Sequence, residues 1–158
     1  MASRPVISTS VAVHLHRDGR VFFLPYSETE NGFDVFDGLP EVVNSIDDAS
    51  ELGRALEAAM ARSFARVLPA VDLRAPDRKS EILEWMKKSS WGQYSRGVRS
   101  VSITVSSEFP EGTLDLRPLQ NKGPRGGFEP VRDTRFQSTY ESVEDLGRLV
   151  QRAMEMAI

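Results

Sequence analysis

The chain has 158 residues, no cysteine and a net charge of −3 at pH 7, with 40% hydrophobic and 27% charged residues. This composition is that of an ordinary globular domain, and it excludes disulfides and thiolate metal sites. The mild charge argues against a general nucleic-acid or membrane binder. The longest apolar run, residues 21–24, is too short to cross a bilayer, and residues 1–5 lack the apolar core of a signal peptide. We therefore expect a cytoplasmic protein without a membrane partner, folded as one domain over residues 1–158.

The first elements along the chain are strands. Residues 6–16 alternate between apolar and polar side chains, residues 17–20 have the composition of a hairpin turn, and residues 21–25 return as a second strand. Further short extended pieces are expected near residues 33–35 and 42–43.

Two helices are predicted next. Asp48 stands three residues before Glu51 and is expected to cap a helix over residues 49–66, whose apolar residues follow helical spacing. Asp77 is expected to cap a central helix near residues 77–89.

The last third of the chain repeats the order of the first. Residues 101–105 alternate, residues 113–118 return after a turn, and residues 121–127 form a glycine-rich loop. A final helix is expected to begin after Ser142, which is suited to an N-cap.

The chain is therefore predicted to be an internal duplication, with repeats 8–67 and 98–158 joined by a helical linker, 68–97. The two copies share a Gly-Phe-acid motif and a Leu-Gly-Arg motif at an offset of 90 to 95 residues. We expect the motif phenylalanines, Phe33 and Phe128, to fill the core. The predicted fold class is α+β (mixed α/β), with duplicated strand-hairpin-helix units, an antiparallel sheet covered by helices, and the central helix.

Neither histidine belongs to a recognisable site. His14 and His16 share one face of a strand, where two imidazoles are able to bind a metal, but no third ligand has a telling spacing. We expect both on a solvated face. The glycine-rich loop lacks the Gly-Lys-Ser/Thr ending of a phosphate loop. No nucleophile, cofactor or metal motif is found, so we predict no enzyme, no cofactor and no small-molecule substrate.

The segment from Lys87 to Arg99 interleaves basic and aromatic residues. This pattern is typical of a nucleic-acid surface, and a small nucleic-acid-binding regulator is the alternative function. Trp85 and Trp91 are more simply explained as core residues, and Glu81 and Glu84 dilute the local charge, so a nucleic-acid partner is not our first choice.

The two copies differ in charge. Residues 28–57 contain nine acids and one base, a net of 1 − 9 = −8, whereas the matching residues 122–151 contain five of each. Asp48 and Glu51 are assigned to helix capping. The other acids cluster around loops, where binding residues are often presented. We predict an acidic surface that meets a basic protein partner, with solubility as the competing explanation. The predicted partner-binding residues are Glu28, Glu30, Asp34, Asp37, Glu41 and Asp47.

Three tracts in about the last 70 residues resemble the contact-dependent growth inhibition immunity protein family. They are Trp91 with the segment 97–101, the Gly-Gly-Phe-Glu-Pro tract 126–130, and the segment 142–147 with its Leu-Gly. The resemblance covers about the last 70 residues well and the first half more loosely, and the loop 121–125 is longer and more basic than the family pattern. It implies a cytoplasmic antidote that binds and neutralises the C-terminal toxin domain of an exported effector, often a nuclease with a basic cleft. The family offers no catalytic residues to carry over.

Overall fold

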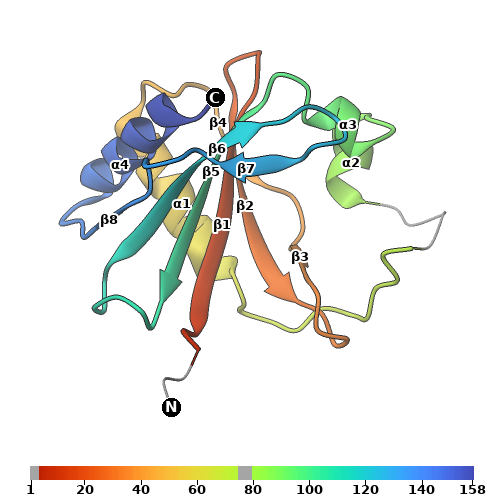
Figure 1. Cartoon of the computed structure of the whole chain (residues 1–158), viewed down its shortest axis with the longest axis horizontal. Coiled ribbons are helices and arrows are strands. Elements are labelled where there is room, and N and C mark those ends of the chain that lie inside the picture. Colours follow the sequence, from red (N-terminus) through yellow and green to blue (C-terminus); the bar gives the residue numbers. More distant parts are fainter. Residues whose placement is uncertain (1–3, 75–79) are drawn as a thin grey trace.

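The computed structural model describes residues 4–74 and 80–158. These residues form eight strands and four helices, in an α+β arrangement that confirms the predicted fold class (Figure 1). The elements in chain order are β1 (Ile7–Leu15), β2 (Val21–Glu28), β3 (Asp34–Phe36), β4 (Glu41–Val43), α1 (Ala49–Arg62), α2 (Glu81–Met86), α3 (Trp91–Tyr94), β5 (Arg99–Ser106), β6 (Leu114–Asn121), β7 (Phe128–Pro130), β8 (Phe136–Ser138) and α4 (Val143–Met156).

The antiparallel sheet is symmetric about its middle. Its order is β3-β2-β1-β5-β6-β7, with β4 pairing a second time with β2 and β8 with β6. In the central pair, Val11 lies opposite Ile103 and Val13 opposite Val101. Val101 and Ile103 follow Val11 and Val13 by 90 residues each, so each residue of β1 pairs with the counterpart of the other. The strand pairing therefore has a pseudo-twofold axis between β1 and β5, at the offset predicted for the repeat.

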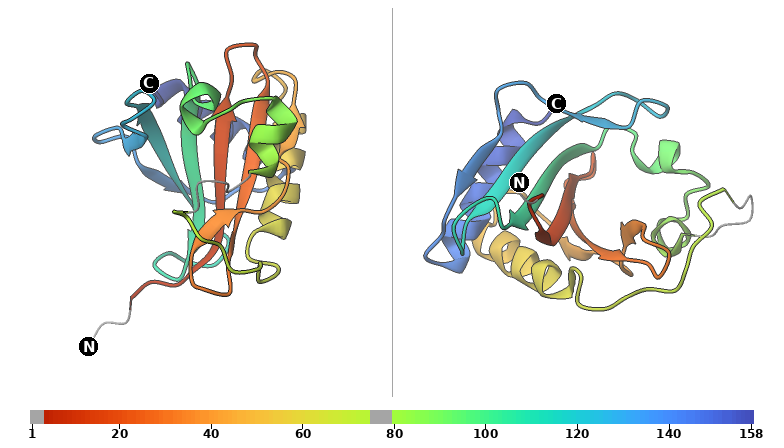
Figure 2. Two further views of the ribbon diagram at one scale, coloured as in Figure 1. Left: turned by 90° about the vertical axis from the view of Figure 1, so that its right-hand side faces the viewer. Right: turned by 60° about the horizontal axis from the view of Figure 1, so that its bottom comes forward.

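Helices α1 and α4 cover one face of the sheet, and the apolar residues between them form the main core (Figures 1 and 2). Both helices begin as expected from their caps. The Asp48 carboxylate accepts a hydrogen bond from the Glu51 backbone N–H, and the Ser142 hydroxyl accepts one from that of Asp145. Such caps satisfy backbone donors that the first helical turn leaves unpaired.

The Leu-Gly-Arg motifs lie where α1 and α4 cross. A Cβ atom added to Gly53 would overlap the carbonyl group of Val143, and one added to Gly147 would overlap that of Ala49. Each glycine therefore admits the backbone of the other helix. The two contacts are related by the pseudo-twofold, which explains why both copies contain the motif.

Helix α1 ends four residues earlier than the periodicity predicts. Ser63 has an extended backbone, and the carbonyl oxygens of Ser10 and Tyr26, both in strands of the sheet, share its one hydroxyl hydrogen at 3.0 Å each. This bond turns the chain back along β2, so that residues 64–71 run beside the first half of the sheet.

Among the described residues, helices cover the opposite face of the sheet only over its first half. There α2 and α3 pack over a second cluster of buried residues: Ala12, Phe22, Leu24, Ile82 and Tyr94. The linker holds these two short helices instead of the single helix predicted near 77–89, because Lys87 adopts a left-handed conformation that ends α2. The predicted cap Asp77 lies outside the described residues.

Candidate functional site on the hairpin and the second sheet face

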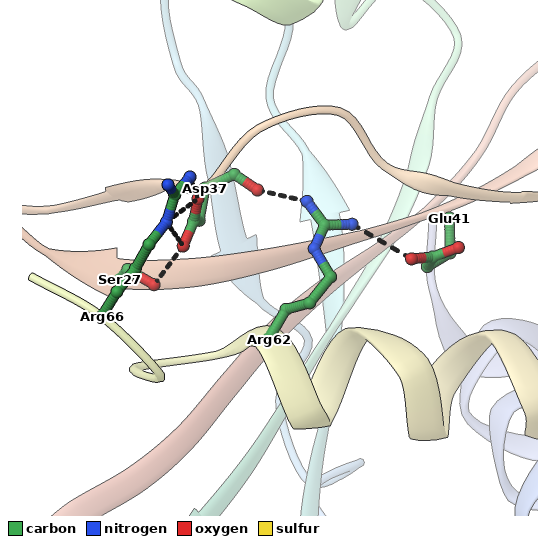
Figure 3. Close-up of polar contacts among 5 residues, drawn as sticks. All are labelled: Ser27, Asp37, Glu41, Arg62 and Arg66. Atoms are coloured by element: carbon green, nitrogen blue, oxygen red, sulfur yellow. Dashed lines mark hydrogen bonds and ion pairs between the residues drawn. The ribbon is translucent and has the colours of Figure 1, made fainter. Parts of the chain in front are cut away.

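Two of the six predicted acidic residues are neutralised by bases. The Asp37 carboxylate is 4% exposed and accepts hydrogen bonds from the Arg66 guanidinium at 2.6 Å and from the Ser27 hydroxyl at 2.8 Å (Figure 3). Arg62 bonds the Glu41 carboxylate at 3.2 Å and also donates to the Asp37 carbonyl. The hydrogen bond from Arg66 lowers the pKa of Asp37, so the carboxylate stays ionised within this cluster.

Three other predicted residues form an exposed group. Glu28, Glu30 and Asp34 lie at the tip of the β2–β3 hairpin, and none has an ion-pair partner among the residues that the structure describes. We call these three residues the acidic tip. Glu28 stands directly opposite Asp34 in the strand pairing. Like charges in such a pair destabilise a hairpin by a few tenths of a kcal/mol, up to about 1, so the acidic tip opposes the stability of its own hairpin.

The backbone of the acidic tip is held in place by the segment that follows α1. Leu68 donates its N–H to the Glu28 carbonyl and accepts from the Glu30 N–H, both at 2.9 Å. Asn31 bonds the backbone of Val71 through both ends of its side-chain amide, at 2.7 and 3.1 Å. The three carboxylates therefore project from a fixed frame.

Asp47 is not part of this group. It is exposed in the turn between β4 and α1, whereas β4 pairs with the beginning of β2, at Val21 to Phe23. The acidic tip lies at the other end of β2, roughly 20 Å away at about 3.3 Å per strand residue. The structure thus separates one residue from the predicted cluster, pairs two with bases, and brings three together.

Next to the acidic tip is a pocket of about 420 Å³ whose lining includes six aromatic side chains. Tyr26 and Phe36 form a cross-strand pair, two residues along each strand from the pair Glu28 and Asp34. Because side chains alternate between the two faces, both pairs lie on the same face of the hairpin. Burial and the nearby charge of Asp34 raise the pKa of Tyr26. The main aromatic walls of this aromatic pocket are His14, Tyr26, Phe36, Trp91, Tyr94 and Phe128.

Several aromatic residues lie in other places than predicted. Trp91 is 39% exposed at the aromatic pocket, and Trp85 is 43% exposed, so neither is a core residue. Phe33 is 44% exposed on the hairpin, and Phe128 is half-buried against His14, with ring centroids 5.5 Å apart. The expectation that Phe33 and Phe128 fill the core is wrong, because both lie beyond the strands that α1 and α4 cover.

The histidines are also buried, contrary to the expected solvated face. His14 is 5% and His16 9% exposed, and their ring nitrogens lie 2.8 and 3.2 Å from the Tyr94 hydroxyl. Burial lowers the pKa of His14 to about 3 and that of His16 to about 4. Both rings are neutral at pH 7 and serve as hydrogen-bond partners of a buried tyrosine. Within residues 4–74 and 80–158, no group of three or more acidic or histidine side chains is placed to hold a metal ion.

The basic segment predicted as a nucleic-acid surface is divided by the fold. The Arg99 guanidinium donates to the carbonyls of Met154 and Ala157 at the end of α4, at 2.7 and 2.8 Å, and so completes the helix. Lys87, Lys88 and Arg96 instead line an open cleft beside the β1–β2 turn.

The bases that pair with Asp37 and Glu41 lie at positions 62 and 66, beyond the charged stretch in which the sequence shows the acidic excess. Because α1 ends before Ser63, Arg62 and Arg66 lie beside the hairpin. No described helix is long and apolar enough to pass through a bilayer.

Comparison with known proteins gives a structural likeness alone. No protein-family model and no curated protein matches the sequence. A protein of unknown function from Neisseria meningitidis has the same fold, with a TM-score of 0.66 at 12% identity and complete coverage of both chains. A chain of the CdiA-CT/CdiI toxin and immunity complex from Yersinia pseudotuberculosis is equally similar, with a TM-score of 0.66, 14% identity and 99% of each chain covered. The fold is therefore that of a chain found in a toxin and immunity complex.

Proposed function

We propose that this chain is an immunity protein that binds and neutralises the C-terminal toxin domain of a contact-dependent growth inhibition effector. The supporting observation is the likeness of fold, over nearly the whole chain, to a chain of a toxin and immunity complex. In this proposal the protein works in the cytoplasm by binding and has no catalytic activity of its own. Its partner is a protein toxin with a basic surface, such as a nuclease.

The acidic tip is the part of the surface that we assign to the partner. Its three carboxylates are exposed, lie on a fixed frame, and repel one another across the hairpin. A basic protein surface relieves this repulsion when it binds, because each carboxylate then gains an opposite charge. Asp37 and Glu41 support the hairpin from behind through Arg66 and Arg62, and have no direct contact with the partner in this proposal.

Charge reversal of the acidic tip tests the proposal. The variant Glu28→Lys/Glu30→Lys/Asp34→Lys is expected to weaken binding at least roughly tenfold at low salt, mainly through slower association, because steering by opposite charges is lost. The measurement is calorimetry and association kinetics with the C-terminal toxin domain of the effector that, under this proposal, a neighbouring reading frame encodes.

The matched control reverses three acids elsewhere, Glu57, Glu111 and Glu155. These residues are exposed and have no ion-pair partner among the described residues, so the control has the same net charge as the test variant. It is expected to bind nearly as tightly as the wild type. Equal weakening in both variants would show a net-charge effect, and failure of the wild type to bind the domain would exclude the proposed function.

A further inference from the structure

A cleft of about 740 Å³ lies between the β1–β2 turn and the helices α2 and α3. One wall of the cleft is the β1–β2 turn, and the other is formed by the linker helices, about 70 residues later in the sequence. The left view of Figure 2 faces the turn and these helices. Its lining contains five basic residues and a single acid, Asp18. The basic residues of this cationic cleft are Arg17, Arg20, Lys87, Lys88 and Arg96.

Most of this positive charge is uncompensated. Asp18 pairs with Arg20 at 2.8 Å, whereas Arg17, Lys87, Lys88 and Arg96 have no ion-pair partner among the described residues. Four unpaired cations around one concave surface repel one another and attract an anion. The cleft also borders His16. Burial is the main cause that lowers the pKa of His16; the charge of Asp18 opposes it, and the charges of Arg20 and Lys88 add to it.

Lys87 has a left-handed backbone conformation, in which glycine is the favoured residue. Lys87 has φ +56° and ends α2, with its own N–H bonded to the Glu84 carbonyl and the next N–H to that of Leu83. Glycine is the favoured residue at such a position, and other residues there are disfavoured by about 1 kcal/mol or more. A lysine at this position is less stable than glycine, yet it places an ammonium group at the mouth of the cleft.

The cleft fits a short anionic group better than a long polyanion. Glu81 and Glu84 are exposed on α2 directly beyond it, so a nucleic-acid strand leaving the cleft on that side would meet two carboxylates. The chain as a whole also has a net charge of −3 and repels polyanions at long range. The carboxylates of a protein loop are short enough to bind inside the cleft without approaching Glu81 and Glu84.

The cleft, the aromatic pocket and the acidic tip are neighbours. Tyr94 lines both the cleft and the pocket, and Phe36 of the pocket stacks near Trp91 with centroids 5.7 Å apart. An exposed aromatic centre between charged borders is the usual composition of a protein interface. One partner surface is therefore able to meet all three.

We propose that the cationic cleft binds an acidic segment of the toxin domain, through carboxylates that contact Lys87, Lys88 and Arg96. This inference rests on the proposed function and adds to it the partner's chemistry: the toxin presents carboxylates to the cleft and bases to the acidic tip, on either side of an apolar contact at Trp91. The interface is thus bipolar.

The test variant is Lys87→Gly/Arg96→Gln, in which glycine removes the charge and suits the left-handed backbone. Its thermal midpoint is expected to equal or exceed that of the wild type, while its affinity for the toxin domain falls on the order of tenfold at low salt. The loss should shrink at about 500 mM salt, because exposed charges are then screened over a few ångströms. The control is Arg4→Gln/Arg132→Gln, which removes two exposed bases outside the cleft and should bind like the wild type.

The outcomes separate the two proposals. If the wild type binds the toxin domain and the cleft variant binds equally well, the cleft inference is wrong and the proposed function stands. If the wild type fails to bind the domain, both are wrong. A single-stranded oligonucleotide is titrated in parallel. Tight binding that is lost in the cleft variant and falls steeply with salt would assign the cleft to nucleic acid and overturn the inference.

Discussion

At the scale of single residues, His14 and His16 stand out as ionisable groups held neutral by burial. The Tyr94 hydroxyl has one hydrogen, so it donates to one imidazole and accepts from the other. Protonation of either ring would place a charge beneath aromatic side chains. The triad of His14, His16 and Tyr94 connects β1 to α3. His14 and Tyr94 also line the aromatic pocket, so the triad holds two of its walls together.

We predict that this triad makes the protein sensitive to mild acid. The pKa of each histidine is lower in the folded chain, about 3 for His14 and 4 for His16, than the ordinary 6.5 of an unfolded chain. The unfolded chain therefore binds protons first, and stability is lost as pH falls from 6.5 towards 4, by up to about 1.4 kcal/mol per pH unit for each histidine.

Urea unfolding at several pH values between 7 and about 4.5 measures this loss. The variant His14→Gln/His16→Gln should show a much flatter pH dependence in that window. The buried carboxylates Asp37 and Asp115 have lowered pKa values and affect stability only below about pH 4. An unchanged slope in the variant would contradict the assignment.

At the scale of elements, the crossing of α1 and α4 is the most constrained contact of the fold. Each helix presents a glycine to the backbone of the other, next to the buried Leu52 and Leu146. Replacing glycine by alanine within a helix ordinarily stabilises it by about 1 kcal/mol. At this crossing the added methyl group meets a carbonyl, which has no side-chain freedom to move away.

We therefore predict that Gly53→Ala and Gly147→Ala each destabilise the protein by about 2–3 kcal/mol, since the helices must separate and the core between them loosens. Thermal or urea unfolding measures the effect. Ala58→Gly, on the exposed side of α1, is the matched control and should lower stability by about 1 kcal/mol through helix propensity alone. A stabilising effect of either alanine would mean that the helices do not cross at these residues.

At the scale of the whole molecule, the two halves share one core. Its buried residues come from both copies: Val11, Val13, Phe23, Leu52 and Leu56 from the first, and Val101, Ile103, Leu116, Leu146 and Val150 from the second. A unit of about 60 residues is only marginally stable alone. Each copy here also loses both its neighbouring strand and its crossing helix when the other is absent.

Separate fragments test this dependence. Residues 1–76 and 77–158, expressed singly, are expected to lack cooperative unfolding by circular dichroism, and the two together are expected to associate and regain it. A fragment that unfolds cooperatively by itself would show that the halves are independent, against the single domain predicted for residues 1–158.

The scaffold was predictable from the sequence because its determinants are local or repeated. Alternation placed β1 and β5, and side-chain caps placed the starts of α1 and α4. The repeated Leu-Gly-Arg motif was visible in the sequence, and the structure adds that its glycines lie where the two helices cross. The end of α1 was not predictable, because Ser63 is fixed by carbonyls of strands distant in sequence.

The site was predictable only in part, since long-range contacts decide which charges remain exposed. Glu28, Glu30 and Asp34 are exposed as expected. Asp37 is instead buried and paired with Arg66, which follows α1. The burial of His14 also depends on distant residues: the alternation of β1 places it opposite the core, and only the linker supplies the Tyr94 that covers it. Partner binding by the six acids stays a prediction, of which the proposed function keeps Glu28, Glu30 and Asp34.

The placement of α2 and α3 over the first half alone has a consequence for stoichiometry. The positions that Phe22 and Leu24 occupy under the linker correspond, in the second half, to Asp115 and Arg117, where a cluster with Arg135 and Gln137 replaces an apolar cover. A twofold scaffold with two equal faces would present two docking surfaces. The linker breaks that equivalence, so within the described residues the cationic cleft, the aromatic pocket and the acidic tip each occur once. Under the proposed function, a complex with one toxin domain per chain is expected.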